Sequence, residues 1–598
     1  MKTFHITLSL LCMIAFGCQK SVLDKQPLDA ISGSTYWNTE QDLQLYNNAV
    51  YPLYITGFGT GFADAIYQPW GVASPQVYGD VITDNAAPLS YSKVAANEYN
   101  TYLSGGSGSG GWNFNNLRTL NFFLDHYQHA NISDSIKHVY AGEIYFFKAW
   151  DYFEKVKLFG DVPWLTHALE TNSPELYQPR TPRAAVMDSI MSNIDTAISW
   201  LPARAIQQSR LPGRLNKDMA LHLKARIALH EGTFRKYHGI ADADRFIRLA
   251  ATTAEALMAT GNYSIYKYPS TTDPYNQLFA KYSYSDNKEV ILWKEYSATL
   301  QLGAAFSRYF AQNLRHQFGV TRNLMDEYLC TDGSPISTSP LFNAADRGII
   351  RNEFANRDPR LAQTVAQYGQ YQLSSSSIQG SNNAPYPNLP GLSGNKCPTG
   401  YRLAKWFLND PADWNRVTNG MQADPIFRYA ETLLIYAEAK AELGECDQQV
   451  LDLTVNAIRD RVGMVHLNIG SIPSDPELDA AYGTYCSYVP SPLLREIRRE
   501  RRVELAFENF RWDDLMRWDA GKFLNIPVLG MKFVQTDYPK ITPGKDIYLN
   551  ADGYIEPYQK TLTGRNRQFN DRQYYFPIDI EDLILNNKLT QNPGWNSK

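Results

Sequence analysis

Hydrophobic and polar residues alternate with a helical period in two separate stretches of the chain. Apolar residues recur there every three or four positions, the spacing that buries one face of an amphipathic helix. In the first stretch the pattern predicts a helix from near Thr39 through Val50 and further helices over 112–130, 135–158, 182–201, 217–236 and 242–260. In the second stretch it predicts helices over 425–443, 448–461 and 492–518. We therefore expect a predominantly α protein.

The segments between these helices have no helical period and are rich in loop-forming residues. Residues 57–111 contain many Gly, Ser, Asn and Tyr, a strand is predicted at 289–294, and 526–575 is again loop-like. Loops of this length inside a compact domain usually carry function. We expect a single domain over 39–598, in which a helical scaffold (about 39–56, 112–262 and 424–522) supports an inserted, irregular, loop-rich lobe with a few short strands (about 57–111, 263–423 and 523–598).

The densest pattern of charge is the block Arg495–Trp518. Read as one helix, it repeats Glu500, Glu504 and Glu508 every fourth residue, each within helical reach of an arginine. Arg501 and Glu504, for example, are three residues apart. A basic arm that binds nucleic acid would instead carry unmatched positive charge. The block therefore predicts a structural helix packed by ion pairs.

The N-terminus has the pattern of an export signal. Lys2 precedes an apolar run over residues 6–16, which is too short to span a bilayer, and small residues lead to Cys18. We expect residues 1–17 to be a signal peptide and 18–38 an extended leader. The pattern resembles a bacterial lipoprotein signal, in which Cys18 becomes the acylated first residue. An ordinary signal peptide with an incidental cysteine is the alternative.

Net charge and aromatic content narrow the class of partner. The 598 residues carry a formal net charge of −4, which gives no electrostatic basis for binding nucleic acid or anionic lipid. Aromatic residues make up 13% of the chain, with 39 tyrosines and 12 tryptophans. This content suits a protein that offers flat faces to a ligand, although a large helical core also uses aromatic residues.

The sequence predicts no cofactor and no metal site. Gly106–Gly111 satisfies the GxGxxG pattern, but no apolar strand precedes it, so we interpret it as a flexible loop. Cys330, Cys397, Cys446 and Cys486, which remain after the signal, fit no metal-binding spacing. Disulfides among them are permitted by export, but the pairing is open. Calcium binding by loop carboxylates is also left open.

The long loops supply residue types that bind sugars. A sugar has an apolar C–H face and a polar rim, so its site needs flat aromatic rings together with carboxylates, amides or arginine. Trp70 and Trp414 lie among Pro, Gly, Ala and Asn without apolar periodicity, so we expect them to be exposed. For every aromatic candidate, ordinary packing in the core is the alternative. The predicted ligand contacts are Trp70, Tyr78, Asp80, Asp84, Tyr91, Tyr371, Tyr386 and Trp414.

Seven motifs, distributed in order along the chain, resemble those of the SusD-like (SusD/RagB) family of Bacteroidetes outer-membrane nutrient-binding lipoproteins. Two of them, ERRVELAFENFRWDDLMRW from Glu500 and the terminal QNPGW from Gln591, resemble the C-terminal signature of that family. The others are KAWDYFEKVKLFGDVP from Lys148, NRDPRL from Asn356, PTGYRLAK from Pro398, DPIFRYAETLLIYAEAKAELG from Asp424 and NAIRDRVGM from Asn456. The resemblance spans nearly the whole chain after the signal.

The resemblance implies both a fold and a function. It implies a scaffold of helix pairs like those of tetratricopeptide repeats, and a non-catalytic, lipid-anchored glycan-binding protein at the surface of the outer membrane. It also implies a partner, a SusC-like TonB-dependent transporter that receives the ligand. Two alternatives remain open. The same fold captures peptides in some relatives, and a carboxylate pair such as Asp80 and Asp84 could serve a glycoside hydrolase.

Overall fold

A computed structural model describes most of the chain. It covers residues 36–58, 77, 79–99, 101, 109–268, 272–311, 318–368, 389–392, 396–416, 418–561 and 567–595. The predicted signal peptide, Cys18 and most of the predicted leader lie outside the described residues. Within these ranges, no helix combines the length and apolar character needed to cross a membrane.

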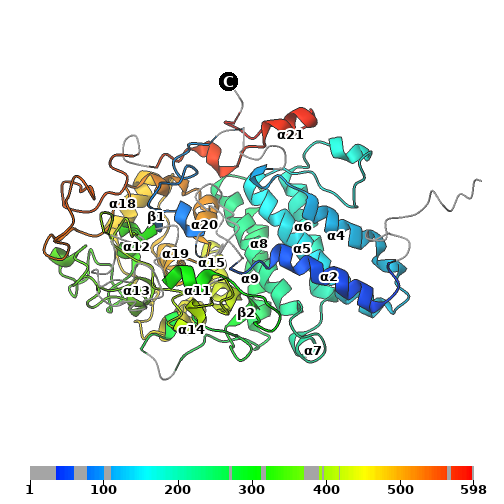
Figure 1. Cartoon of the computed structure of the whole chain (residues 1–598), viewed down its shortest axis with the longest axis horizontal. Helices are drawn as coiled ribbons and strands as arrows, with labels where there is room; N and C mark the ends of the chain where they lie inside the picture. Colours follow the sequence, from blue (N-terminus) through cyan, green and yellow to red (C-terminus); the bar gives the residue numbers. More distant parts are fainter. Residues whose placement is uncertain are drawn as a thin grey trace, which may run out of the picture.

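The N-terminal helices form a bundle on one side of the molecule (Figure 1). Helices α5 and α6 pack against each other, as do α8 and α9, and α2 and α4 lie along α5. Each helix predicted in this stretch is present, and a short helix, α7, was not predicted. The bounds are α2 (Glu40–Tyr54), α4 (Asn115–His126), α5 (Asp134–Phe159), α6 (Arg183–Trp200), α7 (Arg204–Arg210), α8 (Lys217–Tyr237) and α9 (Ala243–Met258).

Local sequence explains where α2 starts and which face it buries. The Thr39 side chain accepts a hydrogen bond from the Asp42 N–H, and the Asp42 carboxylate accepts one from the Thr39 N–H. This reciprocal capping box satisfies two donors that the first turn leaves free. Leu43, Tyr46 and Val50 follow at helical spacing and are buried in the bundle.

The second helical stretch is more interrupted than the sequence predicts. The segment expected to be helical from 425 begins as strand β4 (Asp424–Arg428), and the helix expected over 448–461 is broken at Thr454. A helix, α18, was not predicted. The bounds are α15 (Tyr429–Glu442), α16 (Gln448–Leu453), α17 (Val455–Asp460), α18 (Pro476–Tyr485), α19 (Pro492–Glu504) and α20 (Arg511–Arg517).

The block predicted as one helix over 492–518 is two helices, α19 and α20, separated by residues 505–510. Phe507 and Asn509 have positive φ angles of 59° and 66°, which no right-handed helix contains. Contacts from elsewhere hold this break. The Lys405 ammonium donates to the carbonyl of Ala506, and the Trp406 indole donates to that of Phe507. Tertiary contacts therefore override the helical pattern of the block.

Strands are few and short among the described residues. β1 (Ala86–Pro88) pairs with β3 (Phe318–Val320), and β2 (Val290–Lys294) pairs with β4, both antiparallel. Short helices are scattered between irregular segments in the loop-rich part, on the left in Figure 1. They are α10 (Pro274–Gln277), α11 (Phe306–Ala311), α12 (Arg322–Glu327), α13 (Pro359–Thr364) and α14 (Pro411–Trp414), with α21 (Ile580–Leu585) near the C-terminus.

Two large hydrophobic clusters organise the interior. The larger one lies within the helical bundle, and the smaller one lies in the irregular part around Trp406, which is fully buried. The end of α19 connects them, because Leu505 belongs to the larger cluster and Phe507 to the smaller. The segment 505–510 thus joins the two parts of the molecule.

Candidate functional site

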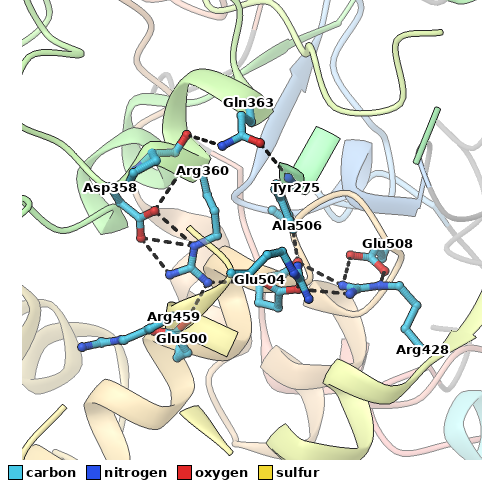
Figure 2. Close-up of polar contacts among 12 residues, drawn as sticks. Tyr275, Asp358, Arg360, Gln363, Arg428, Arg459, Glu500, Glu504, Ala506 and Glu508 are labelled. Atoms are coloured by element: carbon cyan, nitrogen blue, oxygen red, sulfur yellow. Dashed lines mark hydrogen bonds and ion pairs between the residues drawn. The ribbon is translucent and has the colours of Figure 1, made fainter. Parts of the chain in front are cut away.

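The acidic residues of α19 form ion pairs with arginines from distant elements. Glu504 is fully buried and forms ion pairs with Arg360 at 3.2 Å, Arg428 at 3.0 Å and Arg461 at 2.8 Å. Figure 2 shows Glu504 between Arg360 and Arg428. Burial alone would raise the pKa of Glu504, but the three arginines outweigh it and lower the pKa to about 2.

The neighbouring glutamates extend this network in both directions. Glu500 pairs with Arg360 at 2.5 Å and with Arg459 at 2.8 Å, while Glu508 pairs with Arg428 and with Lys405, each at 2.6 Å. All of these side chains are buried. The prediction of a helix packed by ion pairs is therefore confirmed, and its role in this structure is to hold the two parts together.

The sequence placed Arg501 within helical reach of Glu504, but the structure gives Arg501 another partner. Arg501 pairs with Asp514 at 2.9 Å, 13 residues away, and not with Glu504. A short-range pair that was not singled out from the sequence, Arg499 with Glu496 at 3.1 Å, is present. Most other arginines of α19 reach across the fold, because the helix is surrounded by protein and its side chains meet acids from other elements. These contacts are Arg495 with Asp479, Arg498 with Glu442, Arg499 with Asp475, and Arg502 with Glu327 and Asp84.

The interpretation of Asp84 as a ligand contact needs correction. Its side chain is only 4% exposed and is held by Arg502 at 2.9 Å and by Arg511 at 2.8 Å. Burial opposes ionisation, but the two arginines outweigh it and hold the pKa of Asp84 well below its usual range. Both carboxylate oxygens accept hydrogen bonds from arginines of the block Arg495–Trp518, so Asp84 has a structural role here.

Asp80 is also enclosed, and our reading of it as a ligand contact is corrected too. It lies in the 3₁₀ turn η2 (Gly79–Ile82), is fully buried, and accepts hydrogen bonds from the Phe507 N–H at 2.7 Å and the Asn85 amide at 3.0 Å. Burial raises the pKa of Asp80 to about 6. This carboxylate supports the break after α19 and does not reach the surface.

Trp414 is buried, contrary to the expectation that it is exposed. It is 4% exposed, its indole N–H donates to the Leu408 carbonyl at 2.7 Å, and its ring lies 5.6 Å from that of Phe407. Asp410 caps the short helix α14, which turns the tryptophan inward. The surrounding Pro, Ala and Asn reflect this capped turn, and a ring in the core cannot stack on a sugar.

The remaining predicted contacts are one partly exposed tyrosine and four residues without a described position. The Tyr91 hydroxyl donates to Glu98 at 2.6 Å, and its ring meets Tyr558 edge to face at 6.2 Å. Trp70, Tyr78, Tyr371 and Tyr386 lie outside the described residues. The four cysteines, whose pairing the sequence left open, carry free thiols.

A group of surface residues around β2 has the expected chemistry but was missed. We call Tyr282, Ser283, Trp293, Glu295 and Asp410 the outer aromatic patch. Tyr282 is 42% exposed and donates its hydroxyl to Asp410; Trp293, partly exposed, donates its indole N–H to Glu295 at 3.1 Å. Ser283 donates to the same carboxylate at 2.7 Å.

The sequence contained a usable indication of this patch. Trp293 lies two residues before Glu295 near the end of the predicted strand, so both side chains share one face of an extended chain. Tyr282 and Tyr284 are also two residues apart but do not share a face, because no strand forms there: Tyr284 is buried and Tyr282 is exposed. The side that faces solvent depends on the pairing of β2 with β4, which the sequence did not predict.

Comparison with known proteins gives consistent matches over both parts of the chain. A sequence model described as the SusD family matches residues 288–595, and one described as "Starch-binding associating with outer membrane" matches residues 37–229. The curated SusD-like protein P2 of Formosa agariphila is 23% identical over 536 residues, covering 87% of this chain and 92% of the relative. SusD-like protein P38 of the same organism is 24% identical over 559 residues, covering 89% and 95%.

Solved structures share the fold. A SusD-like carbohydrate binding protein from Bacteroides fragilis superposes with a TM-score of 0.70 at 20% identity, covering 93% of this chain and 100% of that one. A second SusD-like protein from the same species gives 0.66 at 23% identity, covering 95% and 100%. The predominantly helical fold with a tetratricopeptide-like scaffold is therefore confirmed.

Proposed function

The chain belongs to the SusD family, and we propose that it is a non-catalytic glycan-binding protein that delivers its ligand to a SusC-like TonB-dependent transporter. Family membership is the observation that carries this proposal. It is supported by the description of the N-terminal match as starch-binding and associating with the outer membrane, and by the carbohydrate-binding description of a structural neighbour. We place the protein at the surface of the outer membrane.

The proposed binding mode is stacking of sugar rings on loop aromatics. Trp70, Tyr78, Tyr91, Tyr371 and Tyr386 remain our candidates, and the outer aromatic patch adds two rings with adjacent carboxylates. Each aromatic contact adds about 0.5–1.5 kcal/mol beyond the burial of area. Anchoring through the lipid on Cys18 would raise the effective concentration of the site beside the transporter, so modest affinity suffices.

The enclosed carboxylates support a binding role over hydrolysis. A glycosidase needs two carboxyl groups that flank a bound substrate. Asp80 and Asp84, one pair that a hydrolase could use, are buried and hydrogen-bonded to the protein. We therefore expect a glycan to be retained without cleavage.

Binding can be tested with residues 19–598 and a panel of polysaccharides and peptides in affinity electrophoresis. We expect retention by at least one polysaccharide. Trp70→Ala and Trp293→Ala should each weaken it about 2- to 12-fold, the range that corresponds to 0.5–1.5 kcal/mol. Tyr177→Ala is the matched control, because Tyr177 is 55% exposed and lies far along the chain from the candidates. Retention by peptides alone would contradict the proposal.

The non-catalytic and partner claims need separate measurements. Incubation with each retained polysaccharide should release no reducing sugar, and release at a rate proportional to protein would contradict the non-catalytic claim.

For the partner, full-length protein should co-purify from detergent-solubilised outer membranes with a transporter of the TonB-dependent class. Recovery of the protein without any such transporter would contradict the delivery role.

A further inference from the structure

A cavity in the scaffold lies apart from the outer aromatic patch. It has a volume of about 520 Å³ and is bounded by the C-terminal end of α2, one face of α5, one face of α8 and the segment around α20. Cavities of roughly 300–1,000 Å³ are typical of small-molecule sites. Of the predicted contacts that the structure describes, Asp80, Asp84, Tyr91 and Trp414 do not line it, nor does any residue of the outer aromatic patch. Leu53, which lines it, is 41% exposed, so the cavity reaches the surface.

The walls combine aromatic rings with charges that are already paired. Tyr54, Trp150 and Phe510 line the cavity and are each partly exposed. Lys157 pairs with Asp513 at 2.6 Å, so this lysine needs no counter-charge from a ligand.

The other cations of the wall are paired in the same way. Lys155 pairs with Asp151 at 3.1 Å, and Arg226 with Glu431 at 2.5 Å. Separating a partly buried ion pair is costly, so a charged ligand would have to compete with these contacts. The wall therefore favours a neutral ligand with one apolar face.

His230, a residue of this wall, has a buried ring nitrogen without a partner. It lines the cavity and is 6% exposed, and its Nδ1 has no hydrogen-bond partner among the described residues. Buried polar atoms are nearly always hydrogen-bonded. Burial, with Lys157 and Arg183 nearby, holds the pKa of His230 well below its usual range, so the ring is neutral. A hydroxyl group suits either tautomer, because it both donates and accepts.

We propose that this cavity binds a small neutral polyhydroxylated molecule of the mono- or disaccharide class, with His230 as a hydrogen-bond partner. The aromatic wall would cover the apolar face of the sugar ring. The site is separate from the outer aromatic patch, and the proposal stands on the cavity and its lining alone. A sugar bound in this cavity would be a second ligand, in addition to the polysaccharide of the proposed function.

The first test observes His230 directly in the unaltered protein. Residues 19–598, labelled at histidine with ¹⁵N and ¹³C, are titrated with glucose, galactose, xylose, maltose and cellobiose while the imidazole resonances are recorded. We expect one of these sugars to shift the His230 signals and leave those of His138 unchanged, because His138 stacks on Trp200 and does not line the cavity. No shift at millimolar concentrations of any of them would overturn the proposal.

The second test compares two histidine substitutions by calorimetry with the same sugar. His230→Phe removes the hydrogen-bond partner and should weaken binding roughly three- to tenfold, whereas His138→Phe should leave the affinity unchanged. Equal affinity in both variants would overturn the assignment of His230. Binding of glycine or a neutral dipeptide in place of every sugar would overturn the ligand class.

The results of the two His230 tests can be distinguished from the result of the polysaccharide-binding experiment. Trp293→Ala, at a described residue that does not line the cavity, should weaken retention by polysaccharide and leave the disaccharide titration unchanged. His230→Phe should do the reverse. If one substitution abolishes both, the cavity is not a separate site and the proposal fails, whereas a protein that binds no polysaccharide can still show the disaccharide-dependent shift at His230.

Discussion

Single buried charges hold residues together that are far apart in the sequence. Glu504 on α19 meets Arg360 from α13, Arg428 at the end of β4 and Arg461 just after α17. All four side chains are at most 5% exposed, so water does not screen these pairs. The loss of one partner leaves the others as uncompensated charges in the interior, which is costly.

Glu504→Gln should therefore destabilise the protein strongly. We expect the free energy of unfolding to fall by about 3–5 kcal/mol, the range for breaking a buried ion pair, measured by urea denaturation followed by tryptophan fluorescence. Asp188→Asn is the matched control, because Asp188 pairs with Arg245 on the surface with 59% of its side chain exposed. A surface pair contributes about 0–1 kcal/mol. Equal small losses in both variants would contradict the role assigned to Glu504.

At the scale of elements, the break between α19 and α20 depends on close contact with η2. Gly79 in η2 lies against the side chain of Asn509, and a Cβ added at Gly79 would overlap that side chain, 2.3 Å from its Cγ. Asn509 has a positive φ, which Asn and Gly tolerate better than other residues. Gly79 and Asn509 together determine the path of the chain between α19 and α20.

Gly79→Ala should be destabilising because of this contact. We expect a loss of about 1–3 kcal/mol, as for overpacking in a core, measured as a shift in the urea midpoint. In the Asn509→Gly background the same substitution should cost much less, because the opposing side chain is gone. A double-mutant cycle gives the coupling energy between the two sites. Additive effects would show that Gly79 and Asn509 do not interact as described.

At the scale of the whole molecule, carboxylates that join distant helices make stability depend on acid pH. Glu438 on α15 accepts from both terminal nitrogens of Arg517 on α20, at 2.5 and 2.7 Å, and from the Trp518 indole at 2.7 Å. Burial opposes ionisation of Glu438, but Arg517 outweighs it and lowers the pKa to about 2, from an ordinary value of 4.5. The folded state thus binds a proton at Glu438 less readily than the unfolded chain.

The stability difference between wild type and Glu438→Gln should change with pH in a defined direction. A lowered pKa gives a contribution that is complete above pH 4.5 and is lost as the pH falls toward 2. The wild type should therefore be more stable by a constant amount from pH 7 to 5, and the difference should shrink between pH 4.5 and 3. Urea denaturation at each pH measures it. A difference that grows on acidification would contradict the assignment.

Patterns carried by neighbouring residues were predictable from the sequence. The start of α2 follows from Thr39 and Asp42, because a capping box and the apolar face behind it are local features. Three further features could be predicted because each depends on spacing within a short segment. They are the helices of the bundle, the buried character of the charged block and the family motifs. These local patterns determined the fold class and the family.

Contacts between distant residues were decided only by the tertiary structure. Arg501 pairs with Asp514 and not with Glu504. Trp414 is buried although its neighbours in the sequence are typical of a loop. Both results depend on which elements meet in space. The break at residues 505–510, the enclosure of Asp80 and Asp84 and the cavity beside His230 have the same origin. A helix pattern reports an apolar face, but it carries no information about what will pack on that face or which charges will be brought to it.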